Sequence, residues 1–503
     1  MSKYVRRFYT LAVLFTAALF FSSLALSQSL AQYEKRIHEY TLDNGLRVII
    51  LEDHSSPVAS FNTYADVGSA NEVVGATGLA HILEHMAFKG TSKIGTFDYE
   101  KEKTLLEKMD AIYDELSLEK KKFNPDKAKI EKLEKEFKDV QDEHSKVVDQ
   151  DGFSKILETE GGEGLNAGTG SDSTVYIISL PSNKAELWAM MESLRFKDPV
   201  FREFYKERDV IIEERRLRTE SNPIGRLVEE FLGMAYKAHP YGVPTIGHMS
   251  DLQQMTIKEL KNFFDKYYVA SNLTIAIAGD VNPEAMIGQI KKYWGDMPKV
   301  DKPIPPKTIE PEQIGERKMV INEKSQPFLL IGYHKPEQKH KDEAVIGLLS
   351  SILADGRTSR LYERLVKKDK SAVFTFAFPG LPGNKYPGLI LVGGVPAKGK
   401  TSAEIETVIL EEIEKFKNEK VSIEELNKVK TQARANLIRG LDSNLGMAIN
   451  LAQYQVNTGD WRNLFKQLDA IIAITPDDIQ NAAKTYMTTK NRTVAMIETE
   501  ETK

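Results

Sequence analysis

A stretch in the middle of the chain recurs near its C-terminal end, and this repeat limits the possible folds more than any other feature. Residues 256–276 align without a gap on residues 475–495. Identical residues occupy the matching positions: Thr256, Asn262, Tyr267, Asn272, Thr274 and Ala276 in the first copy, and Thr475, Asn481, Tyr486, Asn491, Thr493 and Ala495 in the second. Each copy has the pattern of a helix that runs into a strand. We therefore predict an α+β fold built from two homologous domains.

A proline-rich stretch between the two copies marks the expected domain boundary. Residues 298–315 begin with Pro-Lys-Val-Asp-Lys-Pro-Ile-Pro-Pro and lack the periodicity of a helix or a strand. Such a composition favours an extended linker. We predict a first domain at residues 32–297 and a second, homologous domain at residues 316–503, which together provide ample chain for two hydrophobic cores.

Residues 100–150 form a distinct segment inside the first domain, in which lysine and glutamate dominate. Two apolar stripes run through it at three- and four-residue spacing: Leu105, Met109, Ile112 and Leu116, and then Ile130, Leu133, Phe137 and Val140. The sequence Asn-Pro-Asp at residues 124–126 separates them, so we predict an inserted helical hairpin with coiled-coil-like packing. Two roles are considered for this hairpin. It is either a solvated structural insert, or it contacts a partner or acts as a gate over a functional site.

The N-terminal segment has the pattern of a secretory signal peptide. It begins with the basic residues Lys3, Arg6 and Arg7, and an apolar run from Leu11 to Leu26 follows them. We predict that residues 1–31 are a signal peptide with cleavage near Ser27 or Ala31, so that the mature protein is periplasmic or secreted. Because the apolar run is slightly long, an uncleaved membrane anchor is the alternative.

Composition excludes several classes of function. The chain contains no cysteine, which excludes a lipoprotein anchor, a disulfide framework and catalysis by a thiolate. Histidine and carboxylate are then the side chains expected to bind a metal ion. The net charge is −5 and the sequence has no basic patch, so nucleic acid is not an expected partner.

The sequence Gly-Leu-Ala-His-Ile-Leu-Glu-His-Met at residues 78–86 contains the pattern H-x-x-E-H, the inverted zinc-protease signature. If residues 76–88 are helical, His81 and His85 lie one turn apart on one face and can reach one metal ion. Glu84 lies at the shoulder of that face, where it can hold a water molecule without occupying a coordination position. A satisfied pair of core histidines is the alternative, and a zinc site also needs a third protein ligand.

A charged helix is predicted at residues 204–218. Glu207 and Glu214 are two turns apart and therefore share one face of this helix. Val210 and Ile211 lie between them on the side expected to face inward, which suggests that the glutamate face is partly buried. A buried carboxylate requires a metal ion or a cation as partner.

The second copy lacks the metal motif. Its equivalent helix is expected at residues 344–354, where Ser350 and Ser351 are present but histidine and glutamate are absent. We therefore expect one zinc ion per chain, bound in the first domain.

These residues resemble the pitrilysin/insulinase family of zinc metallopeptidases. In size the chain is similar to the branch that contains the mitochondrial processing peptidase and its bacterial relatives. The resemblance covers nearly the whole mature chain and rests on these stretches in family order: residues 68–72, 78–91, 165–167, 172–176, 207–214 and 239–242. It implies a mainly antiparallel sheet packed by helices in each domain.

The resemblance also implies roles for individual residues. His81, His85 and Glu214 become the zinc ligands, Glu84 the general base, and Glu207 a supporting acid. The strand near residues 166–176 resembles an edge strand that binds extended substrate by β-augmentation. Substrate-binding roles follow for Asn166 and Ala167, although Asn166 can equally be a plain turn residue.

The sequence departs from the family pattern at one place. Active relatives carry an arginine and, seven residues later, a tyrosine in the second domain, and these side chains help to stabilise the tetrahedral intermediate. Val366 and Val373 occupy the matching positions here, and valine cannot donate a hydrogen bond to an oxyanion. Since half-size chains of this family face each other as dimers, we expect a heterodimer with a zinc-less family member that carries the Arg/Tyr pair.

Two classes of function follow. The first is a secreted or periplasmic zinc endopeptidase that hydrolyses peptides or unfolded protein segments. The second is a non-catalytic or weakly active subunit, or a scaffold, in a heterodimeric peptidase complex. The complete metal set favours the first class, because a scaffold has no need of Glu84.

Overall fold

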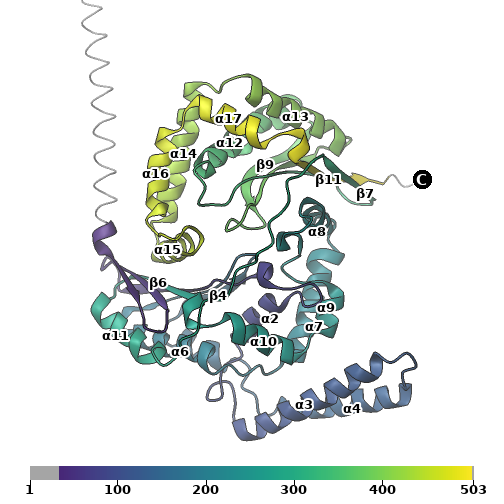
Figure 1. Cartoon of the computed structure of the whole chain (residues 1–503), viewed down its shortest axis with the longest axis vertical. Coiled ribbons are helices and arrows are strands. Elements are labelled where there is room, and N and C mark those ends of the chain that lie inside the picture. The colour runs from purple at the N-terminus through teal and green to yellow at the C-terminus, as the bar shows by residue number, and fades with distance from the viewer. Residues whose placement is uncertain (1–32, 501–503) are drawn as a thin grey trace, which may run out of the picture.

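The computed structural model describes residues 33–500 of the chain (Figure 1). The predicted signal peptide at residues 1–31 lies outside the described residues. Between residues 33 and 500, none of the helices is both long and apolar enough to cross a bilayer.

The first half of the chain forms a six-stranded sheet with the order β1-β2-β6-β3-β5-β4. Its neighbouring strands are antiparallel except for the parallel pair β2 and β6. The strands are β1 (Ile37–Thr41), β2 (Arg47–Glu52), β3 (Val58–Ala65), β4 (Glu163–Thr169), β5 (Thr174–Pro181) and β6 (Leu273–Gly279).

The second half forms a five-stranded sheet with the order β7-β11-β8-β10-β9. Here too one pair, β7 and β11, is parallel and the others are antiparallel. The strands are β7 (Arg317–Glu323), β8 (Phe328–His334), β9 (Ala372–Leu381), β10 (Leu389–Pro396) and β11 (Arg492–Thr499). Both sheets therefore repeat one topology, and the predicted α+β class with mainly antiparallel sheets is confirmed.

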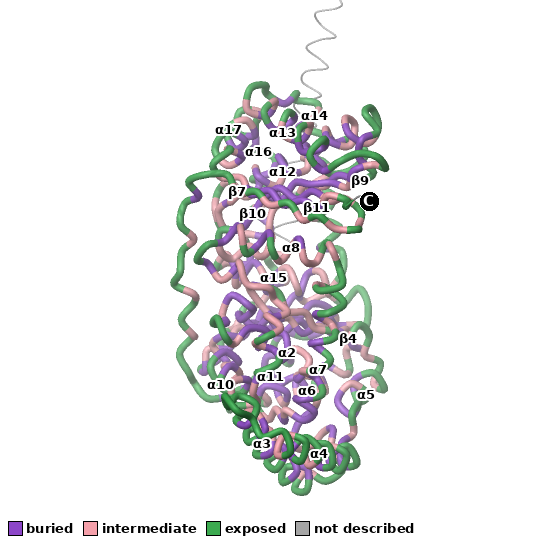
Figure 2. Tube along the Cα trace, turned by 90° about the vertical axis from the view of Figure 1, so that its right-hand side faces the viewer, coloured by how far each residue is buried: buried purple, intermediate pink, exposed green. Residues whose placement is uncertain are grey.

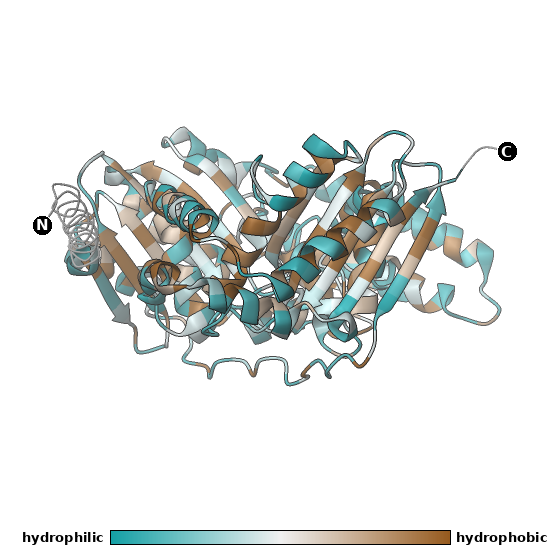
Figure 3. Ribbon diagram, turned by 90° about the horizontal axis from the view of Figure 1, so that it is seen from above, coloured by the Kyte–Doolittle hydropathy of each residue, from teal (hydrophilic) through white to brown (hydrophobic). Residues whose placement is uncertain are grey.

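Helices of the same half cover one face of each sheet. In the first half these are α2 (Leu79–Met86), α6 (Ala185–Lys197), α10 (Ile257–Tyr267) and α11 (Pro283–Trp294). In the second half they are α12 (Glu343–Ala354), α13 (Ser402–Asn418), α14 (Ile423–Gly440), α16 (Asn463–Ala473) and α17 (Pro476–Tyr486). The strands carry much of the apolar sequence, while the outer sides of the helices are polar (Figure 3).

The other face of each sheet is covered by a helix from the opposite half (Figure 1). Helix α15 (Asn444–Thr458) packs on β2, β3 and β6, where Leu451 joins Ile49 and Ala276 in one apolar cluster. Helix α8 (Pro223–Ala235) packs on β7, β8 and β11, where Phe231 joins Ala495. The buried segments of the trace accordingly continue from one half into the other (Figure 2). The halves thus exchange one helix each.

The repeated residues perform the same task in both halves. The side-chain amide of Asn272 donates to the carbonyl oxygens of Tyr267 at 2.9 Å and Asp66 at 3.2 Å. The amide of Asn491 donates to Tyr486 at 2.7 Å and to His334 at 2.9 Å. In each half one asparagine therefore fixes the turn between the helix and its strand to a neighbouring strand end.

The two threonines of the repeat begin the equivalent helices α10 and α17. Thr256 forms a capping box with Glu259, and Thr475 forms one with Asp478. A capping box satisfies backbone donors at the start of a helix.

Residues 100–150 contain two long helices that project from the body (Figure 1). They are α3 (Tyr99–Lys120) and α4 (Lys127–His144), which are followed by α5 (Gly152–Thr159). Arg202 ties the base of this hairpin to the body through Glu102, with N–O distances of 2.7 and 3.1 Å. Burial alone would raise the pKa of Glu102, but hydrogen bonds from His144 and Arg202 hold it at about 2.

Residues 298–316 contain no helix or strand and run along the outside of the molecule (Figure 2). The remaining helices of the first half, α7 (Phe204–Arg215) and α9 (Met249–Gln254), lie beside α2 (Figure 1). Helix α7 continues into a wider, π-helical turn at Arg216–Glu220.

Candidate metal centre

Close packing and a buried glutamate fix the start of helix α2. It covers Leu79–Met86 rather than the expected residues 76–88. Gly78 precedes it with φ of 91°, where a Cβ atom would lie 2.9 Å from the carbonyl oxygen of Ile246. Only glycine fits such a position easily. Glu72 then accepts the backbone N–H groups of Gly78 at 2.8 Å and Ala80 at 2.7 Å, which anchors the start of the helix.

Three predicted ligands meet at one point on the exposed side of α2. Oε2 of Glu214 lies 3.8 Å from Nε2 of His81 and 3.8 Å from Nε2 of His85. The two imidazole rings are 5.0 Å apart and nearly perpendicular, at 83°. One ligand atom from each residue lies within 4.8 Å of the others. The structure therefore brings together two helices, α2 and α7, to form a His₂Glu cluster.

The protonation state of His81 suits a divalent metal ion. Burial lowers the pKa of His81 to about 4, and the positive charges of His85 and Arg218 act in the same direction. His81 is therefore neutral at physiological pH, with a lone pair available for a metal. Two imidazoles and one carboxylate are a donor set that zinc accepts, and three protein ligands leave a coordination position open. The residues fit the metal that the sequence predicts.

Glu207 supports the second histidine. Its Oε2 atom lies 3.3 Å from Nδ1 of His85, so Nε2 of that ring remains directed at Glu214. Burial alone would raise the pKa of Glu207, but hydrogen bonds from His85 and Lys89 hold it at about 2. The glutamate face of α7 was expected to be partly buried because Val210 and Ile211 would face inward. Glu207 is indeed buried, but Val210 is 45% exposed, so the expectation was wrong for this valine.

Glu84 lies next to the cluster on α2 and is half-buried. Within residues 33–500, no side-chain hydrogen bond or ion pair engages its carboxylate. An unengaged carboxylate beside a metal site is suited to accept a proton.

The predicted substrate strand is in fact a pair of strands. Residues 166–176 span the end of β4, a turn and the start of β5, and β4 is the outermost strand of the first sheet. Asn166 and Ala167 pair with Ile177 and Tyr176 on one side only. Oδ1 of Asn166 accepts the N–H of Ala167 at 2.9 Å. Strand β4 also packs against α2, and its outer edge pairs with no other strand of the described sheet.

A broad hollow of about 670 Å³ opens beside Glu214. It lies along α7 and the following π-helical turn, where Val210 and Leu217 expose apolar side chains to solvent. Of the three predicted ligands, Glu214 lines this hollow.

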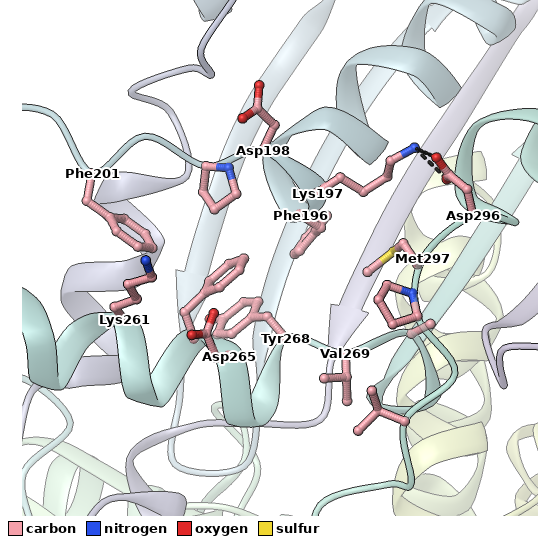
Figure 4. A pocket seen from close by; sticks show the side chains of 15 residues that line it. Phe196, Lys197, Asp198, Phe201, Lys261, Asp265, Tyr268, Val269, Asp296 and Met297 are labelled. Atoms are coloured by element: carbon pink, nitrogen blue, oxygen red, sulfur yellow. Dashed lines mark hydrogen bonds and ion pairs between the residues drawn. The ribbon is translucent and has the colours of Figure 1, made fainter. Parts of the chain in front are cut away.

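A separate cavity of about 530 Å³ lies between α6, α10 and the start of the linker (Figure 4). Its wall includes Phe264, which stacks on Tyr268 with ring centres 5.1 Å apart, and an ion pair between Lys197 and Asp296 closes one end. None of its lining residues belongs to the His₂Glu cluster.

The second half carries valine at both positions that match the Arg/Tyr pair of active relatives. Val366 packs against the second core, and Val373, the second residue of the outer strand β9, is 61% exposed. Neither side chain has a hydrogen-bond donor.

Sequence reasoning missed two residues of the site, Lys89 and Glu203. Nζ of Lys89 lies 2.6 Å from Oε1 of Glu207 and 3.1 Å from Oε2 of Glu203. A signal was present, because a buried carboxylate requires a cation and Lys89 follows α2 closely. Helical periodicity alone could not identify which lysine this would be.

Two protein-family models match the chain. Residues 47–112, which include the H-x-x-E-H helix, match the model of insulinase (peptidase family M16). Residues 254–433 match the model of the peptidase M16 inactive domain.

Similar proteins of known name and structure extend these matches. The zinc protease PqqE of Helicobacter pylori (strain ATCC 700392 / 26695) is 30% identical over 476 residues, which cover 92% of this chain and 93% of that protein. The crystal structure of a protease from Helicobacter pylori superposes with a TM-score of 0.77 at 26% identity, covering 92% of this chain and 99% of the other. The periplasmic protease PqqL of Escherichia coli has the same fold, with a TM-score of 0.67 at 17% identity, covering 92% of this chain but 47% of PqqL.

Proposed function

Because this chain belongs to the insulinase family, peptidase family M16, as the sequence resemblance predicted, we propose that it is a secreted or periplasmic zinc metalloendopeptidase that hydrolyses peptides or unfolded protein segments. Relatives in the family are named zinc proteases. The observation that carries the proposal is the convergence of His81, His85 and Glu214 beside the unengaged carboxylate of Glu84.

The proposed zinc ligands are Nε2 of His81, Nε2 of His85 and Oε2 of Glu214. When bound, zinc supplies Lewis acidity, which makes water more acidic and polarises a peptide carbonyl. Glu84 accepts a proton from the attacking water on its carboxylate and donates it to the nitrogen of the leaving amine. Glu207 accepts the N–H at Nδ1 of His85 and so keeps the lone pair of Nε2 directed at the metal position.

The free edge of β4 is the proposed place for substrate. An extended peptide can add to an unpaired strand edge through backbone hydrogen bonds. Asn166 and Ala167 lie on this outermost strand, and α2 packs against it. A substrate strand bound there would pass next to Glu84.

We further propose that the chain works as part of a dimer, in which the partner is a zinc-less family member. Val366 and Val373 carry no hydrogen-bond donor for an oxyanion at the positions where active relatives have arginine and tyrosine. The size of PqqL supports a two-part arrangement, because this chain matches about half of it. A purified homodimer of this chain with full peptidase activity would contradict the heterodimer.

The second candidate function is a non-catalytic or weakly active subunit or scaffold. The two valines and the match of residues 254–433 to an inactive-domain model favour it. Zinc content does not separate the two functions, because a peptidase and a scaffold could both bind the metal.

The substitution Glu84→Gln tests the proposal, because it removes the proton acceptor without removing a ligand. We expect one zinc ion per chain in the variant and a loss of turnover of about a hundred- to ten-thousand-fold on a peptide library, measured with the partner present. Glu131→Gln, on the exposed surface of α4, is the matched control. Unchanged turnover in Glu84→Gln would exclude this mechanism, and an equally inactive wild type would favour the scaffold.

A further inference from the structure

A single lysine joins the two helices that carry the metal ligands. Lys89 lies three residues beyond the end of α2, and its side chain reaches Glu207 on α7. The lysine and glutamate side chains are only 16% and 12% exposed. Ion pairs between largely desolvated groups are screened far less than those at the surface.

The carboxylate of Glu207 is held at both oxygens. Oε2 lies 3.3 Å from Nδ1 of His85, and Oε1 lies 2.6 Å from Nζ of Lys89. Among the residues that the structure describes, Lys89 is the only cation other than His85 in ion-pair contact with Glu207. Lys89 therefore helps to set the orientation of the Glu207 carboxylate, and with it the direction in which Oε2 meets His85.

Lys89 is itself fixed by the start of α7. Oε2 of Glu203 accepts a hydrogen bond from Nζ at 3.1 Å, and the guanidinium of Arg202 donates to the carbonyl oxygen of Lys89. Glu203 has φ of 59°, a left-handed conformation that is unusual for a residue other than glycine. Its other oxygen accepts bonds from Gln150 at 3.0 Å and Lys206 at 2.9 Å. Both the ammonium group and the backbone carbonyl of Lys89 are therefore held in place by hydrogen bonds.

We propose that Lys89 is a positioning residue of the metal centre, which orients His85 by fixing the carboxylate of Glu207. This inference rests on the proposed function, because it assumes that His85 binds zinc. Without the ammonium group, Glu203 and Glu207 are like charges one turn apart on α7, and no described cation keeps Oε1 of Glu207 in place. His85 would then lose the fixed acceptor that selects its tautomer.

The test is the affinity of the full-length chain for Zn²⁺, measured by competition with a chelating dye. Substitution of residues that orient a metal ligand weakens binding about ten- to a hundredfold, and we expect this loss in Lys89→Met. Lys89→Arg keeps the charge and should recover most of the affinity. Lys206→Met, which removes a lysine that contacts Glu203 but not Glu207, is the matched control and should bind zinc as the wild type does.

A double-mutant cycle separates positioning from a general structural effect. If Lys89 acts through Glu207, the double variant Lys89→Met/Glu207→Gln should bind zinc within about twofold of Glu207→Gln alone. Losses that multiply, or wild-type affinity in Lys89→Met, would overturn the inference. Should Lys89→Met fail to fold by circular dichroism, Lys89→Gln carries the same expectation. A wild-type chain that binds no zinc would instead overturn the proposed function.

Discussion

Helices α2 and α12 occupy equivalent positions against the two sheets, and they differ in what they bury. Helix α2 carries His81, Glu84 and His85. The inner side of α12 is apolar except for Ser350, whose hydroxyl donates to the carbonyl oxygen of Ile346 in the same helix at 2.9 Å. The second helix therefore needs no polar partner, whereas the first requires the carboxylates of α7. The second half shows that this arrangement of sheet and helices forms without a His₂Glu cluster.

The largest difference between the halves should appear when one inner side chain of each helix is truncated. We expect His81→Ala to abolish zinc binding and peptidase activity, because two protein ligands remain where three are needed. Ser350→Ala should leave both unchanged, since its hydroxyl bonds only within α12. Zinc content and cleavage of a peptide library measure the effect. Equal losses of zinc binding and activity in His81→Ala and Ser350→Ala would show that α2 and α12 do not differ in this respect.

The ion cluster at the base of the hairpin should contribute stability to the first half only. Glu102 and Arg202 are fully buried, and removal of one partner of a buried pair typically costs about 3 kcal/mol or more. We expect Glu102→Gln to lower the free energy of unfolding by about this amount at pH 7, with Glu131→Gln as an exposed control.

The same variant should show a specific dependence on pH. Because the pKa of Glu102 is depressed to about 2, its contribution is complete above its ordinary value of 4.5 and is lost as the pH falls towards 2. Denaturant titrations of wild type and Glu102→Gln should therefore converge as the pH is lowered. If the difference in unfolding free energy between wild type and Glu102→Gln grew as the pH fell, the depressed pKa of Glu102 would be contradicted.

The two asparagines of the repeat provide a matched pair of smaller effects. Asn272 is buried and Asn491 is half-buried, and each amide satisfies two carbonyl oxygens. Alanine at these positions should lower the free energy of unfolding by about 2 and about 1 kcal/mol respectively, since unsatisfied buried acceptors cost about 1–3 kcal/mol. A negligible effect at Asn491 would show that the halves differ in structure as well as chemistry.

The smallest expected effects concern the helix caps. Thr256→Ala and Thr475→Ala each remove a capping box and should each lower the free energy of unfolding by about 1 kcal/mol. Chemical denaturation of both variants tests whether the two repeats are energetically equivalent.

The features that sequence reasoning found are those with local causes. Thr256 and Asn272 recur because a helix cap and a turn impose the same requirement in both halves. His81 and His85 were identifiable because four-residue spacing places them on one face of a helix. The family resemblance, rather than spacing alone, pointed to Glu214 as a ligand.

The features that it missed depend on distant parts of the chain. Apolar periodicity shows that α8 and α15 bury one side, but it does not show that each covers the sheet of the opposite half. Val210 was expected to face inward because it is apolar, yet the packing of α7 against α2 uses the side that carries Ile211. Lys89 could not be distinguished from other lysines without the position of Glu203.

The exchange of α8 and α15 has a consequence for synthesis on the ribosome. The strands of the first sheet emerge long before Asn444–Thr458, the segment that covers their second face. Until that segment is translated, the nascent chain exposes Ile49, Leu51 and Ala276 on an open sheet surface. Helix α8 likewise waits for β11, which is translated much later than α8 itself. Each half therefore keeps one sheet face open until a segment far downstream in the sequence has been translated.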